Sequence, residues 1–213
     1  MKMLVTGFEP FGEHAVNPTE ELVRSIKTEA NEPLKEMEIV TAVLPVVFDE
    51  CVEKLIEIIE ETKPDAVLCC GLAAGRSAVT VERIGINIKD VGDGQARKDN
   101  SGQAPTAEKI VPGGPDGLFA TIPVESIVRR MQQEGIPASV SNTAGTYICN
   151  NTLYGLLHAA KERNWPIRGG FIHFPATPVM AAQKPALPSM SIDTMKRALT
   201  TAILATAEAL QRT

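Results

Sequence analysis

Short apolar runs rich in β-branched residues alternate along the chain with longer segments in which apolar residues recur at helical spacing. This alternation is typical of βα units built around a largely parallel sheet. Strands are predicted at 3–6, 38–44, 66–70, 138–141 and 170–174. Helices are predicted at 18–28, 49–61, 123–133, 149–163 and 191–211. The expected fold class is therefore α/β, a three-layer α/β/α sandwich with a mostly parallel, twisted central sheet.

Two segments between these elements are less regular. Residues 78–88 alternate partly between apolar and polar side chains and are long enough to be predicted as one extended strand. Residues 90–117 are rich in polar side chains and hold five glycines before residue 115. We predict a long surface excursion there, and loops of such length in compact domains are usually functional or mobile.

Size and charge narrow the classes of function. With 213 residues, of which 44% are hydrophobic, the chain can bury one substantial core, so a single domain over residues 1–213 is expected. The formal net charge is -5 and the Lys and Arg residues are scattered, so the chain has no basic surface typical of proteins that bind nucleic acid or an anionic membrane, and neither partner is expected. The first apolar stretch is too short for a signal sequence or a membrane span, so a cytoplasmic location is expected.

The four cysteines are Cys51, Cys69, Cys70 and Cys149. They match no zinc or CxxC spacing, and without an export signal they are expected to stay reduced. Cys51 falls in a predicted helix, and Cys69 and Cys70 fall in a predicted strand, where a structural role is favoured. Cys149 differs because it opens a helix just after the loop that follows a buried strand. Ligands of open α/β sheets bind where such loops converge, which makes Cys149 the candidate nucleophile.

A nucleophilic cysteine needs an activating environment and a base. A helix N-terminus lowers the pKa of a thiol, and its amides can bind an oxyanion. Of the three histidines, His14 lies in a polar loop, and His158 lies roughly 13 Å along the helix from Cys149 at 1.5 Å per residue. His173 lies near the end of an apolar strand, at the carboxyl edge of the sheet where the loop before Cys149 is expected to emerge, so it is the best candidate for the base. Glu82 can orient its imidazole as the third member of a triad.

The same positions also fit a protein without this chemistry. A buried cysteine is commonly an inert small hydrophobe, and a histidine in an apolar strand can simply bond to the backbone. Glu82 taken alone is more often a strand-edge carboxylate or a salt-bridge partner. The residue pattern by itself therefore leaves both interpretations open.

Four separated motifs together resemble one family. They are Gly-Phe-Glu-Pro-Phe-Gly at 7–12, Val-Glu-Arg at 81–83, Ser-Asn-Thr-Ala-Gly-Thr-Tyr-Ile-Cys-Asn at 141–150 and Ile-His-Phe-Pro at 172–175. In this order, and over nearly the whole chain, the sequence resembles the pyroglutamyl peptidase I family, also called pyrrolidone-carboxylate peptidase. The resemblance implies a phosphorylase/hydrolase-like α/β fold and a cysteine exopeptidase that removes N-terminal pyroglutamyl (5-oxoprolyl) residues from peptides.

The resemblance also implies roles for individual residues. By position, Cys149 is the nucleophile, His173 the general base and acid, and Glu82 the third member of the triad. The reaction proceeds through an acyl-enzyme and requires no metal or organic cofactor. Members of the family are homo-oligomers, commonly tetramers, so the same assembly is expected here.

The substrate ring is a small uncharged lactam, which must be recognised by shape and backbone hydrogen bonds. The resemblance implies that Phe8 and Phe11 line its site, that backbone groups near Leu72 bind the ring amide, and that Ile148 forms part of the wall. The alternative for Phe8 and Phe11 is a hydrophobic plug that ties the first loop to the core.

The resemblance is weakest at 91–100, where many relatives carry Ala-Arg-Ile-Pro-Asp-Asn. Arg97 is a candidate for the arginine of that stretch, but the longer segment leaves the match open. Two other classes remain as alternatives. A nucleoside-phosphorylase-like enzyme requires a phosphate site, and a catalytically silent small-molecule binding protein is expected to lack one of Glu82, Cys149 or His173.

Overall fold

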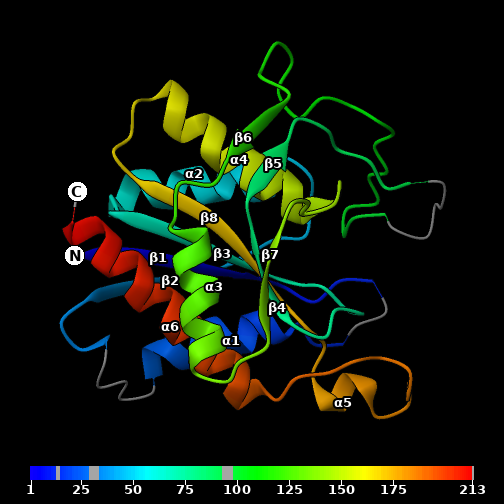
Figure 1. The fold of residues 1–213 in the computed structure, drawn as a ribbon. Helices are drawn as coiled ribbons and strands as arrows, with labels where there is room; N and C mark the ends of the chain where they lie inside the picture. The colour runs from blue at the N-terminus through cyan, green and yellow to red at the C-terminus, as the bar shows by residue number, and fades with distance from the viewer. Residues whose placement is uncertain (13–14, 29–33, 93–97, 213) are drawn as a thin grey trace.

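The computed structural model describes residues 1–12, 15–28, 34–92 and 98–212. Figure 1 shows how strands and helices are layered in these ranges. The strands are β1 (Lys2–Phe8), β2 (Glu38–Leu44), β3 (Ala66–Leu72), β4 (Val79–Glu82), β5 (Ile84–Ile86), β6 (Gly117–Phe119), β7 (Ala138–Ser141) and β8 (Arg168–Phe174). The helices are α1 (Pro18–Thr28), α2 (Glu50–Thr62), α3 (Val124–Gln133), α4 (Ile148–Glu162), α5 (Pro178–Ala181) and α6 (Ile192–Gln211).

The central sheet has the strand order β2-β1-β3-β8-β4-β7. β1 runs parallel to β2 and β3, β3 parallel to β8, and β4 parallel to β7, whereas β4 is antiparallel to β8. β3 is buried at every position, as expected for a strand covered on both faces. The prediction of a mostly parallel sheet is therefore confirmed.

Helices cover both faces of this sheet (Figure 1). α1, α3 and α6 supply one apolar cluster, which includes Leu22, Ile127 and Ile203. α2 and α4 supply a second cluster on the opposite face, which includes Leu55 and Leu153. The predicted three-layer α/β/α arrangement is thus confirmed. In the described part of the chain, no helix combines the length and the apolar character needed to cross a membrane.

The side chain at the start of α1 stabilises both this helix and the loop that follows β1. The Asn17 side chain accepts the amide N–H of Thr19 at 3.1 Å, and Pro18 occupies the first helical position. The same side chain donates to the carbonyl of Glu9 at 3.0 Å. The cap of α1 therefore also holds the loop that follows β1.

The prediction of one strand over 78–88 is wrong. β4 ends at Glu82 inside the central sheet, and β5 leaves it to pair with β6 in a separate two-stranded ribbon. Gly85 lies against the backbone of Tyr154 on α4, where an added Cβ would come within 3.1 Å of the Tyr154 Cα. The partner of β5 comes from the end of the predicted 90–117 excursion, which the alternation of 78–88 does not reveal.

The directions of β4 and β7 also bear on the site. Because β4 and β7 run opposite to β8, the carboxyl end of β7 does not lie at the edge where β8 ends. The short strand β4 is level with the last residues of β8, with Thr80 opposite His173. Residues 142–147 then lead to the start of α4 near Gly71, which is itself paired with His173.

Candidate active site

His173 and Glu82 form a buried pair on neighbouring strands. The His173 Nδ1 and Glu82 Oε1 atoms are 2.8 Å apart, and the two side chains are 5% and 0% exposed. An ionised carboxylate can only accept, so Nδ1 carries the proton. The bond therefore leaves Nε2 of His173 as the atom that can accept a proton from a nucleophile.

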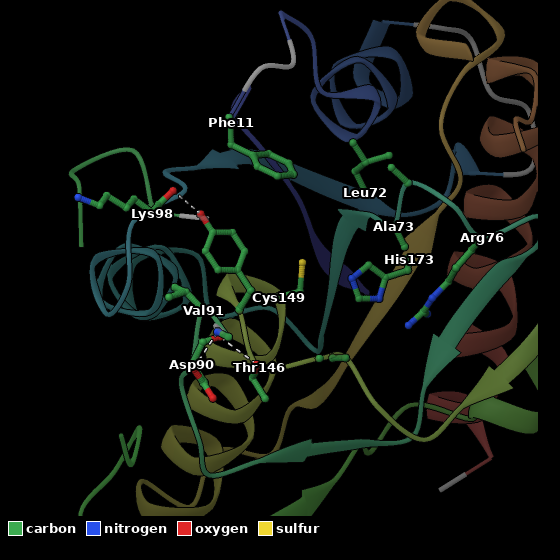
Figure 2. Close-up of a pocket in the computed structure, with 16 residues that line it drawn as sticks. Phe11, Leu72, Ala73, Arg76, Asp90, Val91, Lys98, Thr146, Cys149 and His173 are labelled. Atoms are coloured by element: carbon green, nitrogen blue, oxygen red, sulfur yellow. Dashed lines mark hydrogen bonds between the residues drawn. The ribbon is translucent and has the colours of Figure 1, made fainter. Parts of the chain in front are cut away.

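Cys149 lies in the first turn of α4 and faces the same space as His173. Both residues line one cavity, and Figure 2 shows the Cys149 sulfur directed into it from α4 and the His173 imidazole ring directed into it from β8. Gly71 keeps this space open, because a Cβ there would lie 3.0 Å from the Cys149 sulfur and 2.7 Å from the Phe171 ring. The structure thus brings Glu82, His173 and Cys149 together, as the sequence predicts.

Two buried amides hold the start of α4 in place. Asn150 accepts the N–H of Ile86 at 2.9 Å and donates to the carbonyls of Ile86 and Ile88. Asn151 accepts the N–H of Asp49 at 2.9 Å. The N-cap residue, Tyr147, makes no side-chain cap. The first-turn amides of α4 are therefore positioned to bind an oxyanion beside the nucleophile.

The cavity has a volume of about 550 Å³. Its apolar lining includes Phe11, Leu72 and Tyr147, and the rings of Phe11 and Tyr147 are 6.3 Å apart between centroids. Phe8 and Ile148, expected on the wall, are each 2% exposed and belong to the core cluster beneath it. Phe8 packs on Phe171, with ring centroids 6.3 Å apart. The structure thus places Phe11 and Leu72 on the cavity and the other two residues behind it.

Burial and charge set the protonation of the triad. Burial raises the pKa of Glu82, but the hydrogen bonds with His173, Ser141 and Arg76 outweigh it, so the net pKa is lowered. Burial lowers the pKa of His173, against the opposing effect of Glu82. At neutral pH the pair is therefore a carboxylate bonded to a neutral imidazole.

Burial raises the pKa of the Cys149 thiol to about 12, and the negative charge of Glu82 acts in the same direction. This differs from the expectation that a helix N-terminus would lower it. The residue is only partly exposed where it lines the cavity, and its burial is the largest cause of the shift in pKa. At neutral pH Cys149 is therefore a thiol beside a neutral imidazole.

The remaining cysteines are all fully buried. Burial raises the pKa of Cys51 and Cys69 to about 12 and that of Cys70 well above its ordinary value. These thiols behave as small hydrophobes, in agreement with the structural role favoured by the sequence. His158 stacks on Tyr154, with ring centroids 5.9 Å apart. His14 and Arg97 lie outside the described residues.

Sequence reasoning missed two kinds of residue at the site. Arg76, just after β3, donates to Glu82 Oε1 at 2.7 Å and lines the cavity. Asn150 and Asn151 anchor the helix that carries Cys149. The adjacent Asn-Asn pair inside an apolar helix was a signal, because two buried amides require partners. The Arg76 contact had no comparable signal, since it depends on the pairing of β4 with β8.

A thiol, an imidazole and a carboxylate in this arrangement define a cysteine-dependent hydrolase of the α/β class. No group of three or more His, Cys, Asp or Glu side chains suited to a metal ion occurs within the described ranges. The model of the pyroglutamyl peptidase family matches residues 1–209. The chain therefore belongs to the pyroglutamyl peptidase family, which confirms the resemblance and the prediction of a peptidase.

Individual relatives agree over nearly the whole length. The chain is 47% identical over 204 residues to a pyrrolidone-carboxylate peptidase of a Thermoanaerobacter species, covering 95% of this chain and 96% of that protein. Its fold is similar to the crystal structure of pyroglutamyl peptidase I from Bacillus amyloliquefaciens, with a TM-score of 0.90, 40% identity, and 97% and 94% of the two chains covered. A mutant pyrrolidone carboxyl peptidase from Pyrococcus furiosus gives a TM-score of 0.92 at 39% identity, covering 99% and 100%.

Proposed function

We propose that this chain removes N-terminal pyroglutamyl residues from peptides, with Cys149 as nucleophile, His173 as general base and acid, and Glu82 as the group that orients His173. The observation that carries the proposal is the 2.8 Å bond between His173 Nδ1 and Glu82 Oε1, beside a cavity that Cys149 shares. A carboxylate on Nδ1 fixes the tautomer that a proton-accepting Nε2 requires.

The reaction follows from the protonation states at rest. The Cys149 sulfur attacks the pyroglutamyl carbonyl carbon as its proton passes to His173 Nε2. The resulting oxyanion binds the first-turn amides of α4. His173 returns the proton to the nitrogen of the departing peptide, which leaves a thioester on Cys149. Water, deprotonated by His173, then attacks the thioester, releases pyroglutamate and restores the thiol.

The lining of the cavity supports an uncharged N-terminal ring as substrate. Phe11, Leu72 and Tyr147 offer apolar walls for the flat faces of a lactam. Figure 2 shows the charged ends of Asp90 and Lys98 directed away from Phe11 and Cys149. A substrate with a free α-ammonium group would thus meet apolar side chains where it needs a carboxylate.

The proposal also covers the cellular location and the assembly of the protein. All four cysteines are free thiols in the structure, which suits a reducing compartment, and we place the protein in the cytoplasm. One domain carries the whole site, and the family resemblance supports a homotetramer. Size-exclusion chromatography with light scattering tests the assembly. The phosphorylase and silent-binding alternatives have weaker support, because the relatives are named as peptidases and because the His173–Glu82 pair lies beside the cavity that Cys149 lines.

The activity is tested with a fluorogenic amide of pyroglutamate beside the same leaving group on proline, glutamate and glutamine. We expect hydrolysis of the pyroglutamyl compound and little or none of the others. Phe11→Ala should raise KM because it removes one wall of the cavity. Phe119→Ala is the matched control, since Phe119 is 67% exposed on β6 and does not line the cavity. Equal hydrolysis of all four amides would contradict the proposed substrate.

A further inference from the structure

Arg76 contacts both Glu82 and the segment that leads to Cys149. Its Nη1 donates to Glu82 Oε1 at 2.7 Å and also to the hydroxyl of Thr80. Its Nη2 donates to the carbonyl of Thr143 at 3.2 Å. Thr143 belongs to the segment between β7 and α4, which leads to Cys149. One planar guanidinium thus bridges the orienting carboxylate and the segment before the nucleophile.

The contact with Glu82 falls on the atom that His173 also uses. Glu82 Oε1 accepts both from Arg76 and from His173 Nδ1, whereas Oε2 is buried with no hydrogen-bond partner among the described residues. Glu82 is 0% exposed, and a buried carboxylate stays ionised only when it is paired. Because His173 is neutral at rest, the guanidinium supplies the positive charge that this carboxylate contacts.

The surroundings of His173 hold few other charges. Glu82 faces it from β4, Arg76 from the segment after β3, and Cys149 from α4. The Cys69 and Cys70 thiols on β3 are buried and neutral. Figure 2 shows Arg76 on the side of the His173 ring opposite Cys149. The charge of Arg76 opposes protonation of the imidazole, while Glu82 favours it.

We propose that Arg76 is a positioning residue of this active site, which aligns Glu82 on His173 and fixes the segment that leads to Cys149. This inference rests on the proposed peptidase function. It predicts that loss of Arg76 changes both the rate and its dependence on pH, because the residue acts on the imidazole through charge and on the nucleophile through position.

The test compares the pH profiles of kcat and kcat/KM for the wild type, Arg76→Gln, Arg76→Lys and Arg83→Gln, using a pyroglutamyl amide. Arg83 is the matched control, because it bonds the side chain of Asn142, next to Thr143, and Glu125. Arg83→Gln should leave the acid limb of the profile where it is. The wild-type acid limb is expected below pH 6.5, since His173 must be neutral to accept a proton.

In Arg76→Gln we expect kcat to fall by about tenfold to a hundredfold and the acid limb to move up by about one pH unit. In Arg76→Lys the acid limb should stay near that of the wild type, while kcat remains reduced because a lysine lacks the fork that reaches Glu82 and Thr143 together.

An Arg76→Gln protein that is folded by circular dichroism, yet keeps the wild-type acid limb, would overturn the inference. If that variant does not fold, Arg76→Lys decides, since wild-type kcat in it would overturn the bridging role. A wild-type enzyme that fails to cleave the pyroglutamyl amide would instead refute the proposed function, so the two failures are distinguishable.

Discussion

Gly71→Ala tests whether the space under the nucleophile is part of the site. The added Cβ would lie 2.7 Å and 2.8 Å from two atoms of the Phe171 ring and 3.0 Å from the Cys149 sulfur. Contacts between such atoms are optimal at about 3.5–4.0 Å, so the sulfur has to move by roughly 0.5 Å and the ring by more. Phe171 packs against His173, with ring centroids 4.8 Å apart, so both reacting side chains are displaced.

The expected cost has two parts. Overpacking of this kind destabilises a core by about 1–3 kcal/mol. A displacement of about 1 Å can lower a rate by about a hundredfold, so a shift near half of that predicts a fall in kcat of about tenfold. KM should change less, because the atoms nearest to the added Cβ belong to Phe171 and Cys149 and not to Phe11 or Tyr147.

The assay measures kcat with a pyroglutamyl amide and the free energy of unfolding with urea. Gly170→Ala is the matched control on β8. Its Cβ would meet Ile122 at 2.2 Å, in the apolar cluster on the other face of the sheet. We expect a stability loss of the same order, about 1–3 kcal/mol, but a kcat near that of the wild type. A wild-type kcat in Gly71→Ala would refute the placement of the Cys149 sulfur against Gly71 of β3.

Two further predictions concern the helix start and the buried thiols. Asn150→Ala should lower the free energy of unfolding by about 1–3 kcal/mol and reduce kcat, because it leaves polar groups of Ile86 and Ile88 unpaired; wild-type values in urea melts and rate assays would contradict this. The folded-state pKa values of Cys51 and Cys69 are raised from 9.0 to about 12, so the unfolded chain releases protons first as the pH rises. The contribution of each thiol to the free energy of unfolding should therefore be fully present below pH 9 and fall above it, by up to about 1.4 kcal/mol per pH unit. Urea midpoints that stay constant from pH 8 to 10.5 would contradict this.

The layered fold could be predicted because each helix or strand is indicated by residues within it or next to it. The predicted strands at 38–44 and 138–141 have the same bounds as β2 and β7, and the predicted helix at 18–28 has those of α1. Continuous burial makes β3 apolar throughout, and the Asn17-Pro18 pair marks the start of α1. Signals of this kind lie within a few residues of the element they define.

Features that depend on distant pairing could not be predicted in the same way. Residues 78–88 carry no sign that β4 stays in the sheet while β5 pairs with β6, more than thirty positions later in the chain. Cys149 and His173 were expected to meet because β7 and β8 would end at the same edge of the sheet. The two residues do line one cavity, but β7 runs opposite to β8, so the two strands do not end at the same edge. The two residues meet through the segment at 142–147.

The protonation state of Cys149 also could not be predicted from its position in the sequence. A helix N-terminus is visible in the sequence, but the walls that desolvate Cys149 come from separate elements, including β3 and β8. For the same reason Phe8 and Phe11 could not be told apart. Both lie in one motif, yet Phe8 turns into the core on β1 and Phe11 faces the cavity.

The most direct measurement of the central claim is to trap the acyl-enzyme. An activated pyroglutamyl ester is mixed with the enzyme, quenched in acid during turnover and analysed by peptide mass spectrometry, with Cys149→Ala as the matched control. We predict that the pyroglutamyl group is found on the peptide that contains Cys149, and that the variant shows neither the adduct nor turnover. An adduct on another residue, or full turnover by Cys149→Ala, would contradict the assignment of Cys149 as the nucleophile.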